Sequence, residues 1–184
     1  MTSAEVALRI ATPSDAAAIE ALMKQSAAVL FPRYYDEQQA ASAVRYVAQV
    51  DRMLLEDGTF FLLEHRGEPV ACGGWSRRDR LYTGSGDAAS DSRLLDPATE
   101  PAKVRAMFVR ADWIRRGLGR RILDACEAAA RAEGFSRLSL MATLPGLPLY
   151  LACGFQPLDE ADVALEDGVR LACVAMEKPI SHRR

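Results

Sequence analysis

At residues 109–121 the chain reads Val109-Arg-Ala-Asp-Trp-Ile-Arg115-Arg-Gly117-Leu-Gly119-Arg-Arg121. This segment follows an expected strand, contains two glycines and leads into a strongly amphipathic helix. Amides in the first turn of a helix have no partner within the helix and carry about half a positive charge, and glycine lets a phosphate approach the backbone closely. The pattern therefore predicts a cradle for an anion at the start of this helix.

Arginines flank both glycines, at Arg115, Arg116, Arg120 and Arg121. Cations at a helix N-terminus oppose the helix dipole, so their presence favours a bound polyanion. A Walker loop would need Lys and then Ser or Thr after Gly119, and a Rossmann motif would need Gly or Ala at Ile122 and an acid near Ser139. Neither pattern is present. The pyrophosphate of coenzyme A fits, and a solvated basic helix start stays open as the alternative.

Apolar periodicity predicts the elements on both sides of this segment. The helix runs from Gly117 to Glu133, with Leu118 and Ile122 on its buried face and Gly134 as its stop. Strands are expected at 6–11, 59–64, 68–72, 103–110, 138–142 and 169–176, and further helices after Thr12, at 37–55 and at 147–152. The order β-α-α-β-β-β-α-β-α-β predicts an α+β or α/β fold with a mixed sheet.

Length and charge limit the possible functions. The 184 residues fit one domain over 1–184, with a core at about 6–178, a long surface loop at 78–102 and a tail at 179–184. A net charge of -2 gives no overall basic field, which argues against nucleic acid or an anionic membrane as a partner. The sequence shows no signal peptide and no apolar run long enough to span a membrane, so a cytoplasmic location is expected.

Cysteine and histidine usage argues against a metal site and against nucleophilic catalysis. The cysteines, Cys72, Cys126, Cys153 and Cys173, stand among apolar neighbours without CxxC spacing. They are expected to pack in the core, and no metal is expected. The histidines are His65 and His182, and His182 lies in the tail. A Ser/His/Asp or Cys/His site would therefore depend on His65 alone.

The segment from Met107 to Phe155 resembles the acetyl-CoA-binding core of the GCN5-related N-acetyltransferase family, the GNAT superfamily. That family carries Gln/Arg-x-x-Gly-x-Gly/Ala after its fourth strand. Here Ile114-Arg-Arg-Gly117-Leu-Gly119 stands at that place, with both glycines matched and Ile114 at the first position. The family's tyrosine shortly before Gly-Phe is matched in Tyr150-Leu-Ala-Cys-Gly154-Phe155. The resemblance implies a central mixed, mostly antiparallel sheet flanked by helices.

The resemblance also implies roles for residues of this core. Strand 107–109 would pair its backbone with the pantetheine arm and supply an amide near Val109 to the oxyanion, and the amides of 116–120 would hold the pyrophosphate. Thr143 stands where family members often have asparagine. Tyr150 is similar to the general acid that protonates the departing thiolate, with a packing role as the alternative. The cofactor-binding residues expected are Met107, Phe108, Val109, Arg115, Arg116, Gly117, Leu118, Gly119, Arg120 and Thr143.

The sequence gives fewer signals for the residues that would bind the acetyl acceptor. Tyr34 and Trp75 occupy places that resemble acceptor-site walls in the family, and a plain core position is the alternative for Trp75. The loop mixes Asp87, Asp91 and Asp96 with Arg77, Arg78 and Arg80, which would attract both an amine and a carboxylate. No general base is assigned, because the strand at 104–110 has no carboxylate; Glu100 precedes it and would have to act through water.

The resemblance implies that the chain is an enzyme. The expected reaction is direct transfer of an acetyl group from acetyl-CoA to a primary amine of a small molecule or peptide, with acetyl-CoA as co-substrate and no metal. A non-catalytic acyl-CoA-binding or regulatory module is the first alternative, and a kinase-like phosphate-binding enzyme is the second. The expected partners are acetyl-CoA and the amine acceptor, with a homodimer left open.

Overall fold

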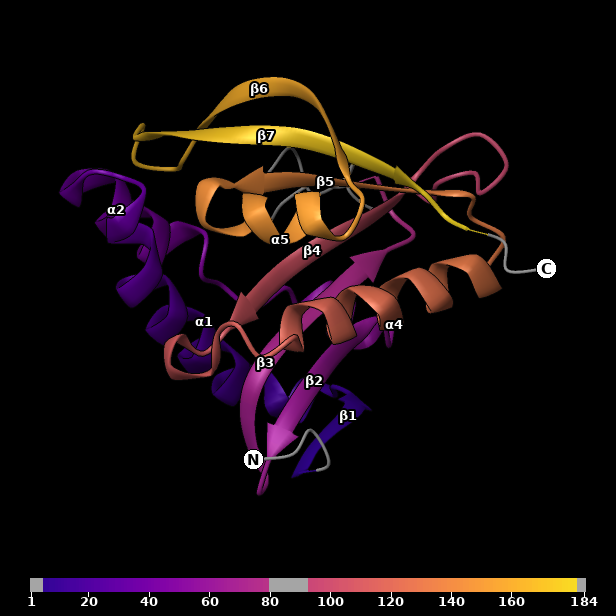
Figure 1. Cartoon of the computed structure of the whole chain (residues 1–184), viewed down its shortest axis with the longest axis horizontal. Helices are drawn as coiled ribbons and strands as arrows, with labels where there is room; N and C mark the ends of the chain where they lie inside the picture. The colour runs from indigo at the N-terminus through magenta and orange to yellow at the C-terminus, as the bar shows by residue number, and fades with distance from the viewer. Residues whose placement is uncertain (1–4, 80–92, 182–184) are drawn as a thin grey trace.

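The computed structural model describes residues 5–79 and 93–181. The strands are β1 (Val6–Ile10), β2 (Phe60–His65), β3 (Glu68–Ser76), β4 (Ala102–Val109), β5 (Arg137–Thr143), β6 (Gln156–Ala164) and β7 (Arg170–Pro179). The α-helices are α1 (Ala16–Leu30), α2 (Glu37–Tyr46), α3 (Arg52–Glu56), α4 (Leu118–Ala132) and α5 (Leu147–Ala152). Figure 1 shows these elements along the chain.

The strands form one seven-stranded sheet in the order β1-β2-β3-β4-β5-β7-β6. Neighbouring strands are antiparallel except for β4 and β5, which are parallel. This parallel pair is joined only at its start, where Ala102 faces Leu138 and Lys103 faces Ser139. Beyond that point β4 and β5 diverge (Figure 1), so the sheet opens into a wedge at its centre.

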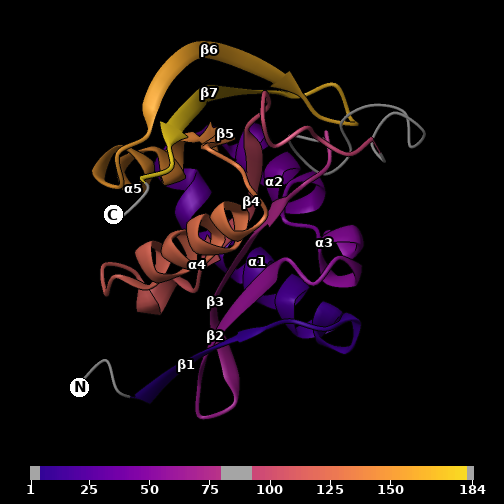
Figure 2. The ribbon, with the colours of Figure 1, turned by 90° about the vertical axis from the view of Figure 1, so that its right-hand side faces the viewer.

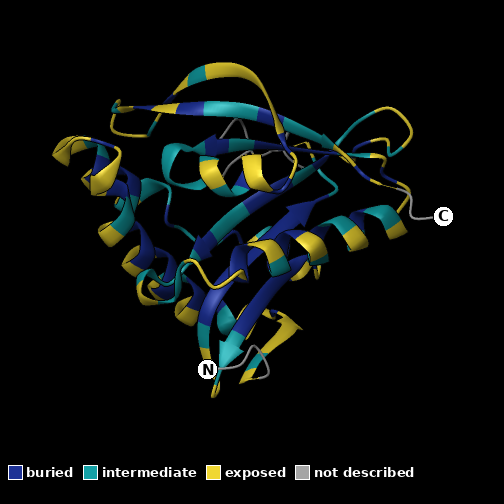
Figure 3. Ribbon diagram, viewed as in Figure 1, coloured by how far each residue is buried: buried dark blue, intermediate teal, exposed yellow. Residues whose placement is uncertain are grey.

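Helices cover both faces of the sheet. Figure 2 shows α4 on one side of β2, β3 and β4, and α1 and α3 on the other. One core cluster lies under α4 and includes Trp75, Ile122 and Phe135. A second cluster lies under α1 and α2 and includes Ile19, Phe31 and Leu171. Figure 3 shows the buried residues following the central strands between these two layers.

Local sequence signals explain the elements next to the wedge. The strands β2 and β3 form a hairpin, and Arg66 (φ 51°) and Gly67 (φ 80°) form the left-handed pair that a two-residue hairpin turn requires. The predicted helix at 117–133 is confirmed as α4, whose apolar face is buried through Leu118, Ile122 and Cys126. The mixed, mostly antiparallel sheet flanked by helices is confirmed as well.

Two predictions about secondary structure are wrong. The single helix expected at 37–55 is two helices, because α2 ends at Tyr46 and the Asp51 side chain begins α3 by accepting a hydrogen bond from the Met53 amide at 3.1 Å. The strand β6 was not predicted, because it is an exposed edge strand of mainly acidic and small residues in which Val163 alone is buried. Period-two alternation of apolar residues is therefore missing from its sequence.

The predicted loop at 78–102 is described only in part. Arg78 and Leu94 pair as an isolated antiparallel bridge that closes its base, and β4 already begins at Ala102. Arg80, Asp87 and Asp91 lie outside the described residues, as does His182. The predicted tail begins later than expected, because β7 extends to Pro179. Within residues 5–79 and 93–181, no helix is both long and apolar enough to cross a membrane.

Candidate functional site

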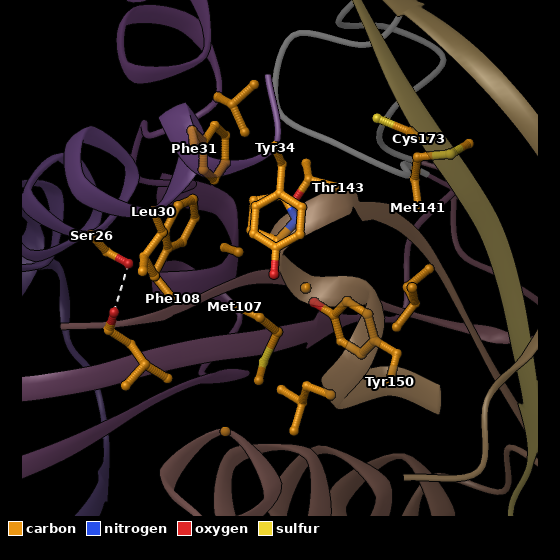
Figure 4. Close-up of a pocket in the computed structure, with 18 of the residues that line it drawn as sticks. Ser26, Leu30, Phe31, Tyr34, Met107, Phe108, Met141, Thr143, Tyr150 and Cys173 are labelled. Carbon is orange, nitrogen blue, oxygen red and sulfur yellow. Dashed lines mark hydrogen bonds between the residues drawn. The ribbon is translucent and has the colours of Figure 1, made fainter. Parts of the chain in front are cut away.

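A cavity of about 740 Å³ fills the wedge between β4 and β5. Its lining comes from both core clusters, with Leu118, Leu140 and Tyr150 from the cluster under α4 and Phe31, Phe108 and Leu171 from the cluster under α1 and α2. The cavity is therefore a passage through the sheet that joins one face to the other. Figure 4 shows some of the side chains that line it.

A bulge in β4 shapes one wall of this passage. Ala106 has a φ of 56°, and the register with β3 shifts between Cys72 and Gly74. The glycine between them, Gly73, is required because a Cβ there would collide with the Met107 sulfur and would lie 2.7 Å from Ile122 Cγ2. A bulge re-aims the side chains beside it. Met107 packs toward the α4 side and Phe108 toward the α1 side, and the backbone between them runs along the cavity.

The free edge of β4 offers backbone groups to a ligand. In the described sheet β5 pairs with β4 only at 102–103, so the rest of this edge, 104–109, faces the cavity. One of these groups has a partner, since the Ser26 hydroxyl donates a hydrogen bond to the Val109 carbonyl at 2.6 Å (Figure 4). An extended, amide-bearing chain can pair with such an edge as an added strand would.

The start of α4 forms the other end of the cavity. Gly117 (φ 76°) and Arg115 (φ 64°) are both left-handed, and no side chain of the described residues caps the helix. The amides of the first turn, 118–120, are therefore available to an anion. At Gly119 a Cβ would lie 2.6 Å from Leu149 Cδ2, so this glycine lets α4 approach the helix α5 closely.

The four arginines of this segment do not act together. Arg115 and Arg120 line the cavity, and Arg120 also donates to the Ala152 carbonyl at 3.1 Å. The Arg116 guanidinium instead lies over the Trp113 ring, 4.4 Å from its centroid, and Arg116 is not among the lining residues. Arg121 points away and donates to the Val6 carbonyl at 3.1 Å. The side-chain charge at the cradle thus comes from two arginines.

Tyr150 places a hydroxyl in the middle of the passage. The residue is 8% exposed, and its ring packs edge-on against Phe155 with centroids 5.7 Å apart. Gly146 allows this position, since a Cβ there would lie 2.8 Å from the ring. Burial raises the pKa of Tyr150 above its ordinary value, so the phenol is protonated at neutral pH. It can therefore donate a proton to a group that becomes basic in the cavity.

The two predicted acceptor residues lie in different places. Tyr34 is 47% exposed and lines the cavity, and Figure 4 shows its hydroxyl and that of Tyr150 directed into the same space. Trp75 is 1% exposed and packs against Phe135 in the core under α4, with ring centroids 5.9 Å apart. It does not line the cavity, so the alternative of a core position for Trp75 is correct.

Tyr35 spans the open side of the wedge, a role its sequence position did not predict. Its hydroxyl donates to the Ala172 carbonyl at 2.7 Å and accepts from the Leu144 amide at 3.0 Å. Leu144 follows β5, Ala172 lies in β7, and Tyr35 precedes α2. One phenol therefore ties the helical layer to the strands on the far side of the cavity.

Replacing Tyr35 by phenylalanine is expected to lower the free energy of unfolding by about 2 kcal/mol, because two backbone groups lose their partner. Chemical denaturation of the variant and the wild-type chain measures the difference. Tyr34→Phe is the matched control, since this neighbouring tyrosine is exposed and its hydroxyl makes no hydrogen bond within the described residues. Equal stability of Tyr35→Phe and Tyr34→Phe would contradict the bridging role.

A second feature that was not predicted is a buried ion pair beside the passage. Arg105 Nη2 and Asp51 Oδ2 are 2.6 Å apart, and the two side chains are 3% and 4% exposed. Asp51 also begins α3, so the pair fixes β4 to that helix. Charged residues 54 positions apart in sequence give no local signal of such a pair. Arg105 lines the cavity with its charge compensated by Asp51.

The cavity is poor in basic groups for proton abstraction. Among its described lining residues the single carboxylate is Glu166, which is exposed on the turn between β6 and β7. Glu100 does not line the cavity, and hydrogen bonds from Arg93 lower its pKa to about 2. In the described part of the chain no group of three or more His, Cys, Asp or Glu side chains is placed to hold a metal ion.

Comparisons with known proteins agree with this geometry. Residues 19–155 match the model of the "Acetyltransferase (GNAT) family". No curated protein matches the chain. A GCN5-related N-acetyltransferase structure from Rhodopseudomonas palustris is similar at 22% identity and a TM-score of 0.72, covering 97% of this chain and 98% of that one.

Two similar structures hold the cofactor according to their descriptions. PaiA N-acetyltransferase from Thermoplasma acidophilum, in complex with coenzyme A, has 12% identity and a TM-score of 0.65, covering 97% of this chain and 99% of that chain. YncA of Salmonella typhimurium, a putative acetyltransferase with acetyl-CoA, has 16% identity and a TM-score of 0.62, covering 97% and 96%. At these identities the likeness shows a shared fold.

Proposed function

The chain belongs to the GNAT family of acetyltransferases, and on that premise we propose that it transfers the acetyl group of acetyl-CoA directly to a primary amine of a small molecule. The observation that carries the proposal is the passage through the sheet, which has an anion cradle at one end and the protonated Tyr150 hydroxyl at its middle. Donor and acceptor can enter such a passage from opposite faces and meet inside it.

The residues on the α4 side suit coenzyme A. Its pyrophosphate would lie on the first-turn amides at 118–120, with Arg115 and Arg120 beside it. Its pantetheine amides would pair with the free edge of β4 at 104–109, with Thr143 across the cavity. The Ser26 hydroxyl donates a hydrogen bond to the Val109 carbonyl at 2.6 Å. We infer that this hydrogen bond breaks, or that the carbonyl accepts a second one, when the pantetheine arm binds.

The residues in the middle of the passage suit acetyl transfer. The amine nitrogen forms a bond to the acetyl carbon while the carbon–sulfur bond breaks, and the amine proton leaves to water. A backbone amide in the bulged part of β4, near Val109, donates to the acetyl oxygen as negative charge develops on it. Tyr150 gives its proton to the departing sulfur and regains one from water, so that free thiol and amide are the products and the phenol is restored.

Release of coenzyme A thiol from acetyl-CoA over a panel of primary amines tests this function. We expect thiol and acetylated amine to form in equal amounts, with little thiol released when no amine is present. Tight binding of acetyl-CoA without turnover on any amine would instead identify an acyl-CoA-binding module. Tighter binding of ATP than of coenzyme A would point to a kinase-like enzyme.

Turnover is expected to tolerate alkaline pH. A general acid is lost as pH rises through its pKa, and burial raises that of Tyr150 above the ordinary value of about 10. We therefore expect kcat at saturating substrates to show no fall from loss of this proton up to about pH 10. A decline in kcat below about pH 9 that is absent from Tyr150→Phe would contradict the assignment.

A further inference from the structure

The part of the passage under α1 and α2, on the acceptor side, has a mainly apolar wall. It is built by Phe31, Tyr46, Val47, Met141, Leu165 and Leu171. Figure 4 shows Phe31 and Tyr34 on one side of this space and Met141 and Cys173 on the other. Cys173 adds no charge, because burial raises the pKa of its thiol to about 11. We refer to this space as the acceptor chamber.

The charged groups that the described residues place around the acceptor chamber are paired or lie at its rim. Arg105 is the buried charge in its wall, and Asp51 pairs with it at 2.6 Å. Arg33 and Glu166 also line the cavity, but both are exposed and they have opposite signs. Among the described residues, the buried charge of the wall is already paired, so a second charge carried deep into the chamber by an acceptor would leave water without a free partner there, and such a transfer is costly.

Hydrogen bonds between α2 and the hairpin of β6 and β7 also hold the wall in place. Gln39 Nε2 in α2 donates to the Arg170 carbonyl at 2.9 Å, and the Ser42 hydroxyl donates to Asp167 Oδ2 at 2.7 Å. Tyr35 adds its bond to Ala172 in β7. The helix α2 and the hairpin of β6 and β7 are therefore joined beside the chamber. A preformed apolar chamber favours a small molecule that fills it with its own apolar body.

We propose that the acceptor is a small primary amine carried on an uncharged apolar body, such as an alkyl or aryl-alkyl chain. This inference rests on the proposed function and names its substrate class. Desolvation in the acceptor chamber also favours the neutral form of the amine, which is the nucleophile. Among the described residues, the single carboxylate that lines the cavity is the exposed Glu166. Deprotonation of the amine by desolvation therefore explains how transfer occurs without a buried general base.

A series of straight-chain amines from propylamine to hexylamine tests the substrate class. Each buried methylene is expected to raise kcat/KM about two- to fourfold until the acceptor chamber is filled. Pentylamine and putrescine have the same number of heavy atoms and differ at the far end, in a methyl or an ammonium. We expect pentylamine to be preferred by at least about tenfold. Equal or reversed preference, or no gain with chain length, would overturn the proposal.

Leu165→Asp places a carboxylate in the chamber wall. We expect it to reduce the preference for pentylamine over putrescine by about tenfold. Leu158→Asp is the matched control, because Leu158 is 57% exposed on β6 and does not line the cavity; this variant is expected to keep the wild-type preference. The amine series uses the unmodified chain, so the proposal is tested even if Leu165→Asp fails to fold.

Binding of each amine to the chain saturated with coenzyme A is measured by calorimetry beside turnover. Binding and turnover together distinguish a failure of the proposed acetyl transfer from a failure of the proposed apolar acceptor. Affinity that rises with alkyl length, without acetyl transfer, would keep the apolar acceptor chamber and overturn the proposed function. Turnover that is fastest on putrescine would keep acetyl transfer and overturn the apolar acceptor.

Discussion

Replacing Gly117 by glutamate is expected to weaken acetyl-CoA binding at least about 100-fold. The residue is left-handed at the start of α4, and its side-chain direction opens into free space beside the cradle. A glutamate there brings a carboxylate to the amides that would hold the pyrophosphate, where it competes for them and repels the ligand. Calorimetric titration with acetyl-CoA measures the loss.

Gly58→Glu separates this effect from backbone strain. Gly58 has a φ of 71°, close to the 76° of Gly117, and a Cβ at either position meets no atom within 4 Å. Both variants therefore carry a similar conformational cost and the same added charge. Gly58 does not line the cavity, so Gly58→Glu should bind acetyl-CoA as the wild-type chain does. Equal affinity of Gly117→Glu and wild type would rule out the cradle.

Replacing Tyr150 by phenylalanine is expected to lower kcat about 100-fold or more, the effect typical of losing a general acid. The ring and its edge-on contact with Phe155 are kept, so the fold and the affinity for acetyl-CoA should change little. Steady-state kinetics at saturating acetyl-CoA, together with calorimetry, distinguish a loss of chemistry from a loss of binding.

Tyr34→Phe identifies which of the two hydroxyls supplies the proton. Both are directed into the same space, but Tyr34 is 47% exposed whereas Tyr150 is 8% exposed. We expect Tyr34→Phe to keep kcat within about threefold of wild type, because an exposed phenol can be replaced by water. A large loss in Tyr34→Phe with full turnover in Tyr150→Phe would reverse the assignment.

The part of the site that the sequence predicted is encoded locally. Gly117, Gly119 and the apolar face of α4 lie within one short segment, so turn geometry, helix start and buried stripe can all be read from neighbouring residues. The short helix that carries Tyr150 follows directly from its own sequence as well. The free edge of β4 was implied by family resemblance, and the structure accounts for it through the divergence from β5.

The features that were missed depend on contacts far apart in the chain. Tyr35 is bonded to Leu144 and Ala172, and no residue near Tyr35 signals these partners. The arginine run suggested a single cluster, whereas Arg116 stacks on Trp113 and Arg121 reaches β1. Which way a long side chain turns depends on the tertiary surroundings, and so does the burial of Trp75 against Phe135.

The central claim is that donor and acceptor enter the wedge from opposite faces of the sheet and meet at Tyr150. A crystal structure of the chain with coenzyme A and hexylamine tests it most directly. We expect the pyrophosphate on the amides at 118–120, the sulfur within hydrogen-bond distance of the Tyr150 hydroxyl, and the alkyl chain in the acceptor chamber under α1 and α2. Coenzyme A bound outside the wedge, or both molecules on the α4 side, would contradict the account.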